Sequence, residues 1–163
     1  MTRLAPILLT LLAFAASCNG DDPPSQEGRD DPPSQEEFAD QANEICRAAE
    51  QSLDNVAEGA DEPEDIVDAI DEVIAESRNA VGELDGLERP EGEAGETAEQ
   101  FVRATRREIE DEGIPALEEL RRAVESEDNE AVRAAAVRLQ RIDSSASNRA
   151  ARALGATDCA EEQ

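Results

Sequence analysis

The chain contains no histidine, lysine, tyrosine or tryptophan, and only three phenylalanines. Without an imidazole base or a lysine amine, it cannot form a Ser-His-Asp triad, a Schiff base or a Ser-Lys pair. Carboxylates are plentiful, but a glycosidase needs two of them placed about one sugar, and the aromatic rings on which a sugar would stack are nearly absent. We therefore expect a protein that is not an enzyme and has no catalytic residue.

The lack of histidine also limits metal chemistry. A ferritin-like di-iron bundle requires Glu-x-x-His motifs, which this chain cannot supply. Acidic residues do gather at the start of one expected helix: Asp61, Glu62, Glu64, Asp65 and Asp68. They lack the alternating ligands and the glycine of an EF-hand loop, and acidic residues at a helix N-terminus are explained by the helix dipole. The sequence thus predicts no metal site and no cofactor.

The charge is strongly one-sided. Aspartate and glutamate number 41 against 15 arginines, a net charge of −26 at pH 7. This charge repels phosphate groups, so we expect no nucleic-acid partner. The acidic residues concentrate in residues 18–95 and the arginines in residues 96–163, which predicts that the second half lies against the first with a modest electrostatic gain. An acidic face that recruits cations or a basic partner is the alternative.

The N-terminal segment resembles a targeting signal. Residues 1–3 give a positive start, and residues 4–16 form an apolar run too short to cross a bilayer, which requires about 20 residues. Small residues (Ala-Ala-Ser) precede Cys18, as a lipoprotein signal peptidase requires. We predict a signal peptide over residues 1–17 and acylation of Cys18 with palmitate-type chains, which would anchor the protein to the extracytoplasmic face of a bacterial cell membrane. Ordinary secretion with cleavage after Ala15 is the alternative.

The other two of the three cysteines lie in the region expected to fold. In an oxidising compartment Cys46 and Cys159 are expected to form a disulfide, which leaves Cys18 for the lipid. A redox or metal-binding pair would favour Cys-x-x-Cys spacing or histidine neighbours. A link closing more than a hundred residues is expected to contribute about 4 to 5 kcal/mol in the chain-entropy model.

A repeated heptapeptide separates the signal from the folded region. The sequence DDPPSQE occurs at residues 21–27 and again at residues 30–36. Paired prolines and acids without an apolar residue predict an extended, self-repelling spacer. We therefore divide the rest of the chain into a disordered tether, residues 18–34, and a helical domain, residues 35–163. In polyproline II geometry the tether would span up to roughly 50 Å.

Apolar residues at steps of three and four predict the first two helices. Ser34 and Glu37 form a capping box at the start of the first helix, which we expect to reach about Glu58. The second begins within residues 61–64, with Pro63 in its first turn. Its apolar face contains Ile66, Ile70, Val73, Ile74, Ser77, Val81 and Leu84.

The third helix is expected after a connection over residues 87–95, which contains one proline and two glycines. Thr97 and Gln100 offer a second capping box, and apolar residues continue to Val124. Pro115 lacks an amide donor and crowds the preceding turn. The third helix is therefore expected to be kinked or split near Pro115.

The fourth helix is expected to begin near Ser126 or Asp128 and to run without interruption to Leu154, with Gly155 as its C-terminal cap. Four amphipathic helices with short connections predict an all-α fold, an antiparallel up-down-up-down four-helix bundle with one disulfide. Many inward positions are alanine, so the core is expected to be thin.

Three short motifs carry a resemblance: ANEIC at residues 42–46, LERP at residues 87–90 and ALGATDC at residues 153–159. Together they resemble small secreted or lipid-anchored helical proteins of high-GC Gram-positive bacteria. The resemblance implies a helical domain closed by a cysteine pair, and it brings no activity or catalytic residue with it.

These observations favour a membrane-tethered, non-catalytic interaction or envelope-maintenance module, whose partner is an envelope protein or a small ligand. A solute- or cation-binding lipoprotein is the alternative. An apolar cavity between the helices would favour a small ligand, whereas an exposed groove would favour a protein partner.

Overall fold

The computed structural model describes residues 31–57 and 63–160, and regular structure within them is helical throughout. The elements are α1 (Gln35–Ala57), α2 (Pro63–Gly86), α3 (Gly92–Arg106), the π-helical η1 (Arg107–Gly113), α4 (Ile114–Glu125), α5 (Asn129–Leu139), α6 (Ser145–Leu154) and the 3-10 turn η2 (Thr157–Cys159). Cys18, the predicted signal peptide and most of the predicted tether lie outside the described residues. None of the helices in the described part is both long and apolar enough to span a bilayer.

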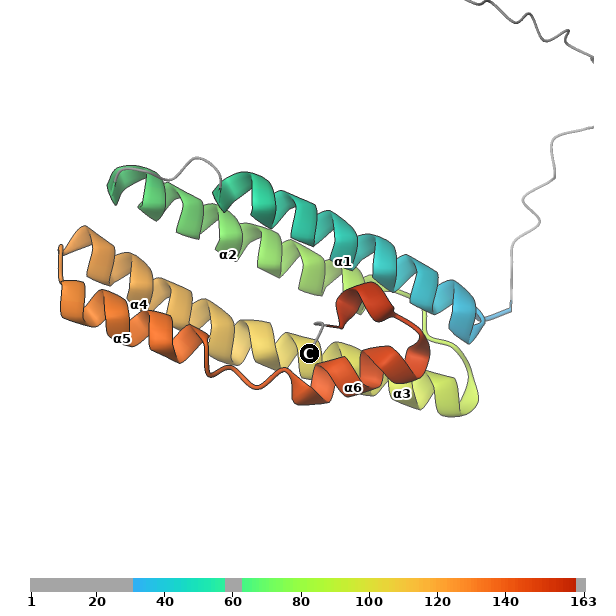
Figure 1. The fold of residues 1–163 in the computed structure, drawn as a ribbon. Helices are drawn as coiled ribbons and strands as arrows, with labels where there is room; N and C mark the ends of the chain where they lie inside the picture. The colour runs from blue at the N-terminus through green and yellow to red at the C-terminus, as the bar shows by residue number, and fades with distance from the viewer. Residues whose placement is uncertain (1–30, 58–62, 161–163) are drawn as a thin grey trace, which may run out of the picture. The chain divides into compact units, whose positions relative to one another are not determined.

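The helices of residues 31–160 lie in two layers (Figure 1). One layer is the hairpin of α1 and α2. The other is the continuous helical path of α3, η1 and α4, against which α6 packs on α3 and α5 packs on α4. The layers meet chiefly where α2 contacts α4 and where η2 returns to α1.

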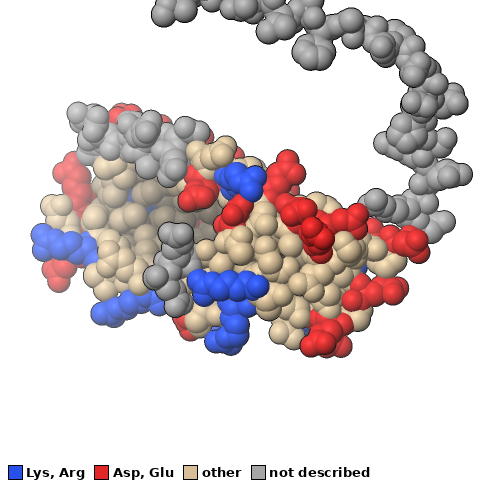
Figure 2. All heavy atoms as spheres, turned by 45° about the vertical axis from the view of Figure 1, so that its right-hand side comes forward, with Lys and Arg blue, Asp and Glu red and all other residues tan. Residues whose placement is uncertain are grey.

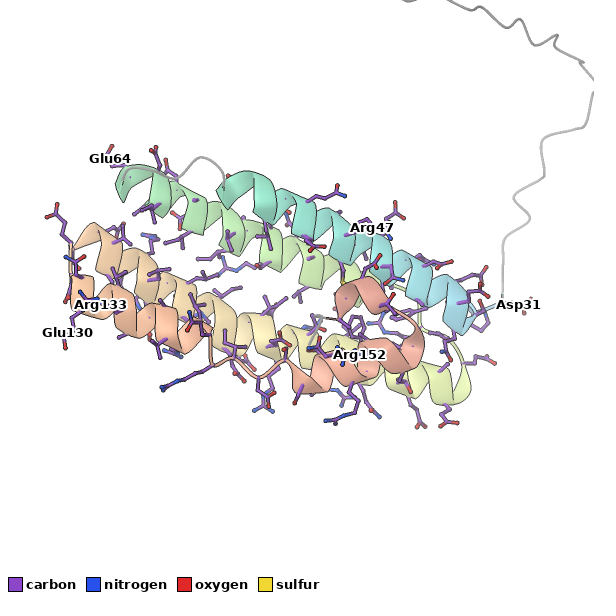
Figure 3. All side chains as sticks on the ribbon, in the orientation of Figure 1. Asp31, Arg47, Glu64, Glu130, Arg133 and Arg152 are labelled. Carbon is purple, nitrogen blue, oxygen red and sulfur yellow. A yellow bond between two sulfur atoms is a disulfide. The ribbon has the colours of Figure 1, made fainter. Side chains whose placement is uncertain are left out.

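The predicted disulfide is present. Cys46 on α1 is bonded to Cys159 in η2, and their Cα atoms are 5.2 Å apart. Beside it, the Arg47 guanidinium pairs with the Asp158 carboxylate, and Figure 3 shows Arg47 on α1 next to η2. The last turn of the domain is therefore attached to α1 by a covalent bond and an ion pair.

The start of α1 confirms the predicted capping box. The Ser34 amide donates to Glu37 Oε2 at 2.9 Å, and the Glu37 amide donates to Ser34 Oγ at 3.2 Å. Each side chain thus satisfies an amide that the first helical turn leaves without a partner. This cap fixes the entry of the chain one turn before the fully buried Phe38.

The start of α3 differs from the prediction. The helix begins at Gly92, so the predicted capping box at Thr97 and Gln100 is wrong, and Thr97 Oγ1 instead donates to the Glu93 carbonyl within the helix at 2.9 Å. Gly92 has φ of +64°, and a Cβ on Gly95 would lie 2.1 Å from the Pro90 carbonyl oxygen. The two glycines start this helix because they permit a positive φ and a close backbone approach.

The irregularity expected near Pro115 takes the form of a π-helical segment. α3 passes into η1 at Arg107, and α4 begins at Ile114 with Pro115 in its first turn. Proline offers no amide hydrogen and crowds the preceding turn, and the wider π turn accommodates both effects without breaking the helical path.

The predicted fourth helix is two helices, so the prediction of one uninterrupted element is wrong. α5 begins after Asp128, whose Oδ1 accepts from the amides of Glu130 and Ala131, as expected for a cap. The chain then leaves the helix at residues 140–144. There Asp143 Oδ1 accepts from the Ser145 amide at 3.0 Å, because a short polar side chain competes for the backbone and starts a new helix. Gly155 ends α6 with φ of +90°.

The core is divided into two clusters. The larger lies between α1, α3 and α6 around the buried rings of Phe38 and Phe101. The smaller joins α2 to α4 through Ile70, Ile74 and Ile114. Alanines fill much of the larger cluster, so its helices approach closely.

Ion pairs link the two layers as the uneven distribution of charge predicts. Arg106 pairs with Asp85, and Arg121 Nη1 lies 3.5 Å from Asp71 Oδ1. These side chains are 35 to 55% exposed, so each pair contributes less than about 1 kcal/mol. In Figure 2 acidic side chains dominate the end of the domain where α1 and α3 begin.

Candidate functional site

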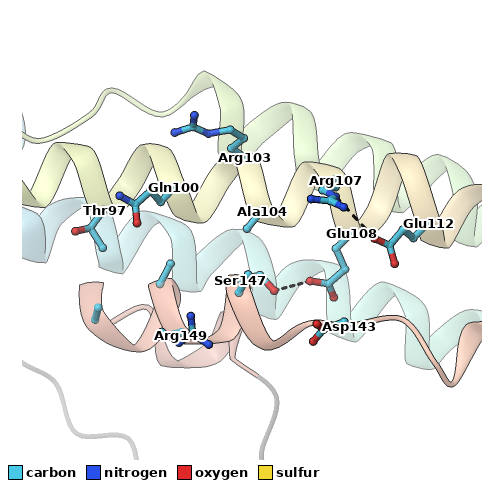
Figure 4. Close-up of a pocket in the computed structure, with 13 residues that line it drawn as sticks. Thr97, Gln100, Arg103, Ala104, Arg107, Glu108, Glu112, Asp143, Ser147 and Arg149 are labelled. Atoms are coloured by element: carbon cyan, nitrogen blue, oxygen red, sulfur yellow. Dashed lines mark hydrogen bonds and ion pairs between the residues drawn. The ribbon is translucent and has the colours of Figure 1, made fainter.

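An open groove of about 660 Å³ lies between α3, η1 and α6 (Figure 4). We call it the α3–α6 groove. Its lining residues are Thr97, Gln100, Arg103, Ala104, Arg107, Glu108, Glu112, Asp143, Ala146, Ser147, Arg149, Ala150 and Ala153.

Small residues form the bottom of the groove and long ones its rim. Ala104 and Ala150 allow α3 and α6 to pack closely, whereas the side chains of Gln100, Arg103 and Arg149 are exposed above them. The groove is therefore a surface feature that a partner can enter from solvent without any opening of the fold.

A buried hydrogen bond crosses the groove. Ser147 is 5% exposed, and its hydroxyl donates to Glu108 Oε2, which brings the π-helical η1 against the first turn of α6. Figure 4 shows this bond between the two elements. A π turn inside a helix often occurs at a functional site, and here it carries Glu108 to the junction of the groove with the next hollow.

The charges of the groove are balanced, in contrast to the chain as a whole. Three arginines and three acids line it, and Arg107 Nε lies 3.9 Å from Glu112 Oε1. The Ser145 side chain and amide, with the nearby Arg149 charge, hold the pKa of the Asp143 carboxyl below its usual value of 3.8. The three acids lie on η1 and just before α6. Arg103 lies on α3, where the other lining residues are uncharged.

A second hollow, of about 320 Å³, lies between α2, the junction of η1 with α4, and the segment that joins α5 to α6. We call it the Ser77 pocket. Its lining residues are Ser77, Glu108, Ile109, Gly113, Ile114, Leu117, Leu139, Gln140, Ile142 and Ser144. Half of these residues are branched aliphatic, whereas the lining of the α3–α6 groove contains no such residue.

The predicted site residues are distributed unevenly. Cys46 and Cys159 are joined, and Cys18 lies outside the described residues. Of the acidic residues near the start of α2, Asp61 and Glu62 also lie outside. Among the residues that are described, no group of three or more acidic or cysteine side chains is arranged to hold a metal ion.

Sequence reasoning missed both hollows. Two signals point to them in retrospect. One is a pair of arginines four residues apart, Arg103 in α3 and Arg107 at the start of η1, and the other is a serine on the apolar face of α2, Ser77. Comparisons with protein-family models, with curated proteins and with solved structures found no match. The function must therefore be inferred from the side chains themselves.

Proposed function

We propose that this protein is a non-catalytic interaction module, tethered by a lipid on Cys18 to the outer face of a bacterial cell membrane, and that it binds an envelope protein through the α3–α6 groove. One observation carries the binding proposal: this groove is open, exposed and balanced in charge, on a chain of net charge −26. Such a surface suits a protein segment better than an enclosed small ligand.

The proposed architecture is an antiparallel up-down-up-down four-helix bundle with two interrupted members. In it, α3, η1 and α4 form the third member, and α5 with α6 forms the fourth. The packing of α1 on α2, of α2 on α4, and of α5 and α6 along the third member supports this arrangement. Figure 3 supports it too, because Glu64 and Glu130, near the starts of α2 and α5, lie at the end of the domain opposite Asp31.

The tether is supported by the sequence around Cys18 and by the acidic, proline-rich repeat that follows it. It is tested by growing the producing bacterium with radiolabelled palmitate. We expect the label in the wild-type protein and none in a Cys18→Ser variant, which should be recovered from the medium. An unlabelled wild-type protein found free in the medium would contradict lipid anchoring.

The chemistry of the groove indicates what its partner presents. Arg103 and Arg149 have exposed guanidinium groups, which bind carboxylates with two parallel hydrogen bonds. The alanines of the lining leave a floor against which the backbone of a partner segment can pack. We therefore propose that the partner contributes a segment with an acidic residue directed at these arginines.

The binding proposal is tested by placing a photo-crosslinking amino acid at Gln100, on the rim of the groove, in living cells. We expect a defined adduct from Gln100, and none from the same amino acid at Asn79, an exposed position on α2 that contributes nothing to the groove. Adding Arg149→Glu should weaken the adduct at least fivefold. Equal adducts at both positions, or no effect of Arg149→Glu, would contradict binding in the groove.

A further inference from the structure

The Ser77 pocket exists because three departures from regular packing coincide. Ser77 is three residues after Ile74 and four before Val81, both buried, so it occupies an inward position on α2 with a short side chain. Gly113 faces it from η1 with no side chain, and the chain opposite leaves the helix at residues 140–144. A large aliphatic residue at position 77 would be expected to fill this space.

About half of the pocket's exposed lining is apolar surface that the fold does not cover. Five large aliphatic side chains line it: Ile109, Ile114, Leu117, Leu139 and Ile142. Only Ile114 among them is fully buried, and the others remain partly exposed. An apolar occupant would remove this surface from water, which is favourable by about 25 cal/mol for each Å² covered.

The polar side chains of the pocket come from α2, from η1 and from the segment that joins α5 to α6: Ser77, Glu108, Gln140 and Ser144. The Ser77 hydroxyl and the Gln140 side-chain amide make no hydrogen bond within the part of the chain that the structure describes. Both can donate and accept. Glu108 lies at the same hollow on a strongly acidic protein, so a ligand with a carboxylate would be repelled. A neutral head group is favoured.

We propose that the Ser77 pocket binds a neutral amphiphile with a short aliphatic chain and a hydroxyl or amide head. The chain packs against the five aliphatic walls, and the head hydrogen-bonds to Ser77 and Gln140. The volume of about 320 Å³ lies at the small end of the range for ligand pockets, which limits the occupant to a short chain. This site is independent of the partner proposed for the α3–α6 groove.

The experiment titrates the isotope-labelled protein with 1-octanol and, separately, with octanoate at pH 7, and follows methyl resonances by NMR. With 1-octanol we expect saturable shifts confined to the methyl groups of the five lining residues Ile109, Ile114, Leu117, Leu139 and Ile142. With octanoate, which has the same chain length and a charged head, we expect at least tenfold weaker binding.

Two variants on α2 distinguish binding in the Ser77 pocket from nonspecific adsorption of octanol to the protein surface. Ser77→Leu fills the pocket and should abolish the octanol shifts, whereas Asn79→Leu adds the same group on the exposed side of the same helix and should leave them unchanged. If Ser77→Leu does not fold, the smaller Ser77→Val serves, with at least fivefold weaker binding expected. Shifts that do not saturate, that survive in the folded filling variant, or that are equal for octanoate would overturn the proposal.

Discussion

At the scale of the residue, Arg89 shows how one side chain replaces several missing partners. Its Nη1 donates to the carbonyl of Leu84 at 3.2 Å and to that of Leu87, and its Nη2 donates to the Asp85 carbonyl at 3.3 Å. These are carbonyls that the end of a helix leaves without intrahelical partners. The guanidinium also lies 5.6 Å from the ring centre of Phe38. Arg89 therefore joins the end of α2 to the larger core cluster through a fork that lysine cannot reproduce.

Asp143 supplies a prediction about pH. Because its pKa is lowered in the folded protein, chiefly by the Ser145 side chain, its contribution to stability is present above the unfolded pKa, about 3.9, and is lost as pH falls through the folded pKa. In a Ser145→Ala variant we expect the titration midpoint of the Asp143 carboxyl carbon to rise toward 3.8, measured by NMR.

The same variant should lose stability relative to wild type at pH 6, and the difference should disappear as pH falls below the folded midpoint. Ser126→Ala is the control, because Ser126 donates to the Ala123 carbonyl and has no contact with Asp143. A midpoint that is unchanged in Ser145→Ala would show that this serine does not hold the Asp143 pKa down.

At the scale of the element, Gly95 supplies a prediction because it lies against Pro90, and Gly82 in α2 is its matched control. A Cβ on Gly95 would lie 2.1 Å from the Pro90 carbonyl oxygen, so Gly95→Ala must displace the backbone before α3 and should lower the free energy of unfolding by about 1–3 kcal/mol. Gly82 lies inside α2 with nothing within 4 Å of its added Cβ. Gly82→Ala should therefore raise stability by about 0.5–1 kcal/mol. Urea unfolding measures both, and equal effects would contradict the close approach.

Elements whose boundaries depend on local bonds could be predicted from the sequence. The caps at Ser34 and Asp128 are satisfied within three residues of the helix start, so spacing alone identifies them. The start of α3 could not be found, because Gly92 and Gly95 have the composition of a connection, and their helical role depends on where the Pro90 carbonyl lies. The break after α5 could not be predicted from the sequence, because Ile142 continues the apolar spacing of the helix and lines the Ser77 pocket.

The candidate sites were less accessible to prediction than the helices. The disulfide was predicted from the number of cysteines and from the oxidising compartment that the N-terminal segment predicts, and the structure confirms the disulfide. The α3–α6 groove depends on which faces of two helices meet, and hydrophobic spacing does not specify this for helices rich in alanine. The sequence predicts that Ser77 lies on the apolar face of its helix. Whether Ser77 also borders a hollow depends on η1 and on the break between α5 and α6, and the spacing of residues in α2 specifies neither. Acylation of Cys18 stays a prediction.

At the scale of the whole molecule, the two core clusters are held together differently. The larger cluster combines α1, α3 and α6 and is closed by the disulfide, since Cys159 and Ala160 pack against it. The smaller cluster rests on three buried isoleucines and partly buried neighbours between α2 and α4. Six of the eleven buried residues of the larger cluster are alanines, which bury little apolar area each, so the covalent link adds cohesion at this end of the chain.

The Cys46–Cys159 disulfide is expected to hold the C-terminal end of the domain in place. The double variant Cys46→Ser/Cys159→Ser removes a bond that spans 113 residues, and the chain-entropy model predicts a loss of about 4–5 kcal/mol in the free energy of unfolding, measured by urea titration. Amide exchange should locate the effect. We expect η2 and the end of α6 that leads into it to lose protection before the amides around Ile74, because η2 depends on the link to stay against α1. Uniform loss of protection, or a cost below about 1 kcal/mol, would mean that the packing of Phe38 and Phe101 holds this end without the disulfide.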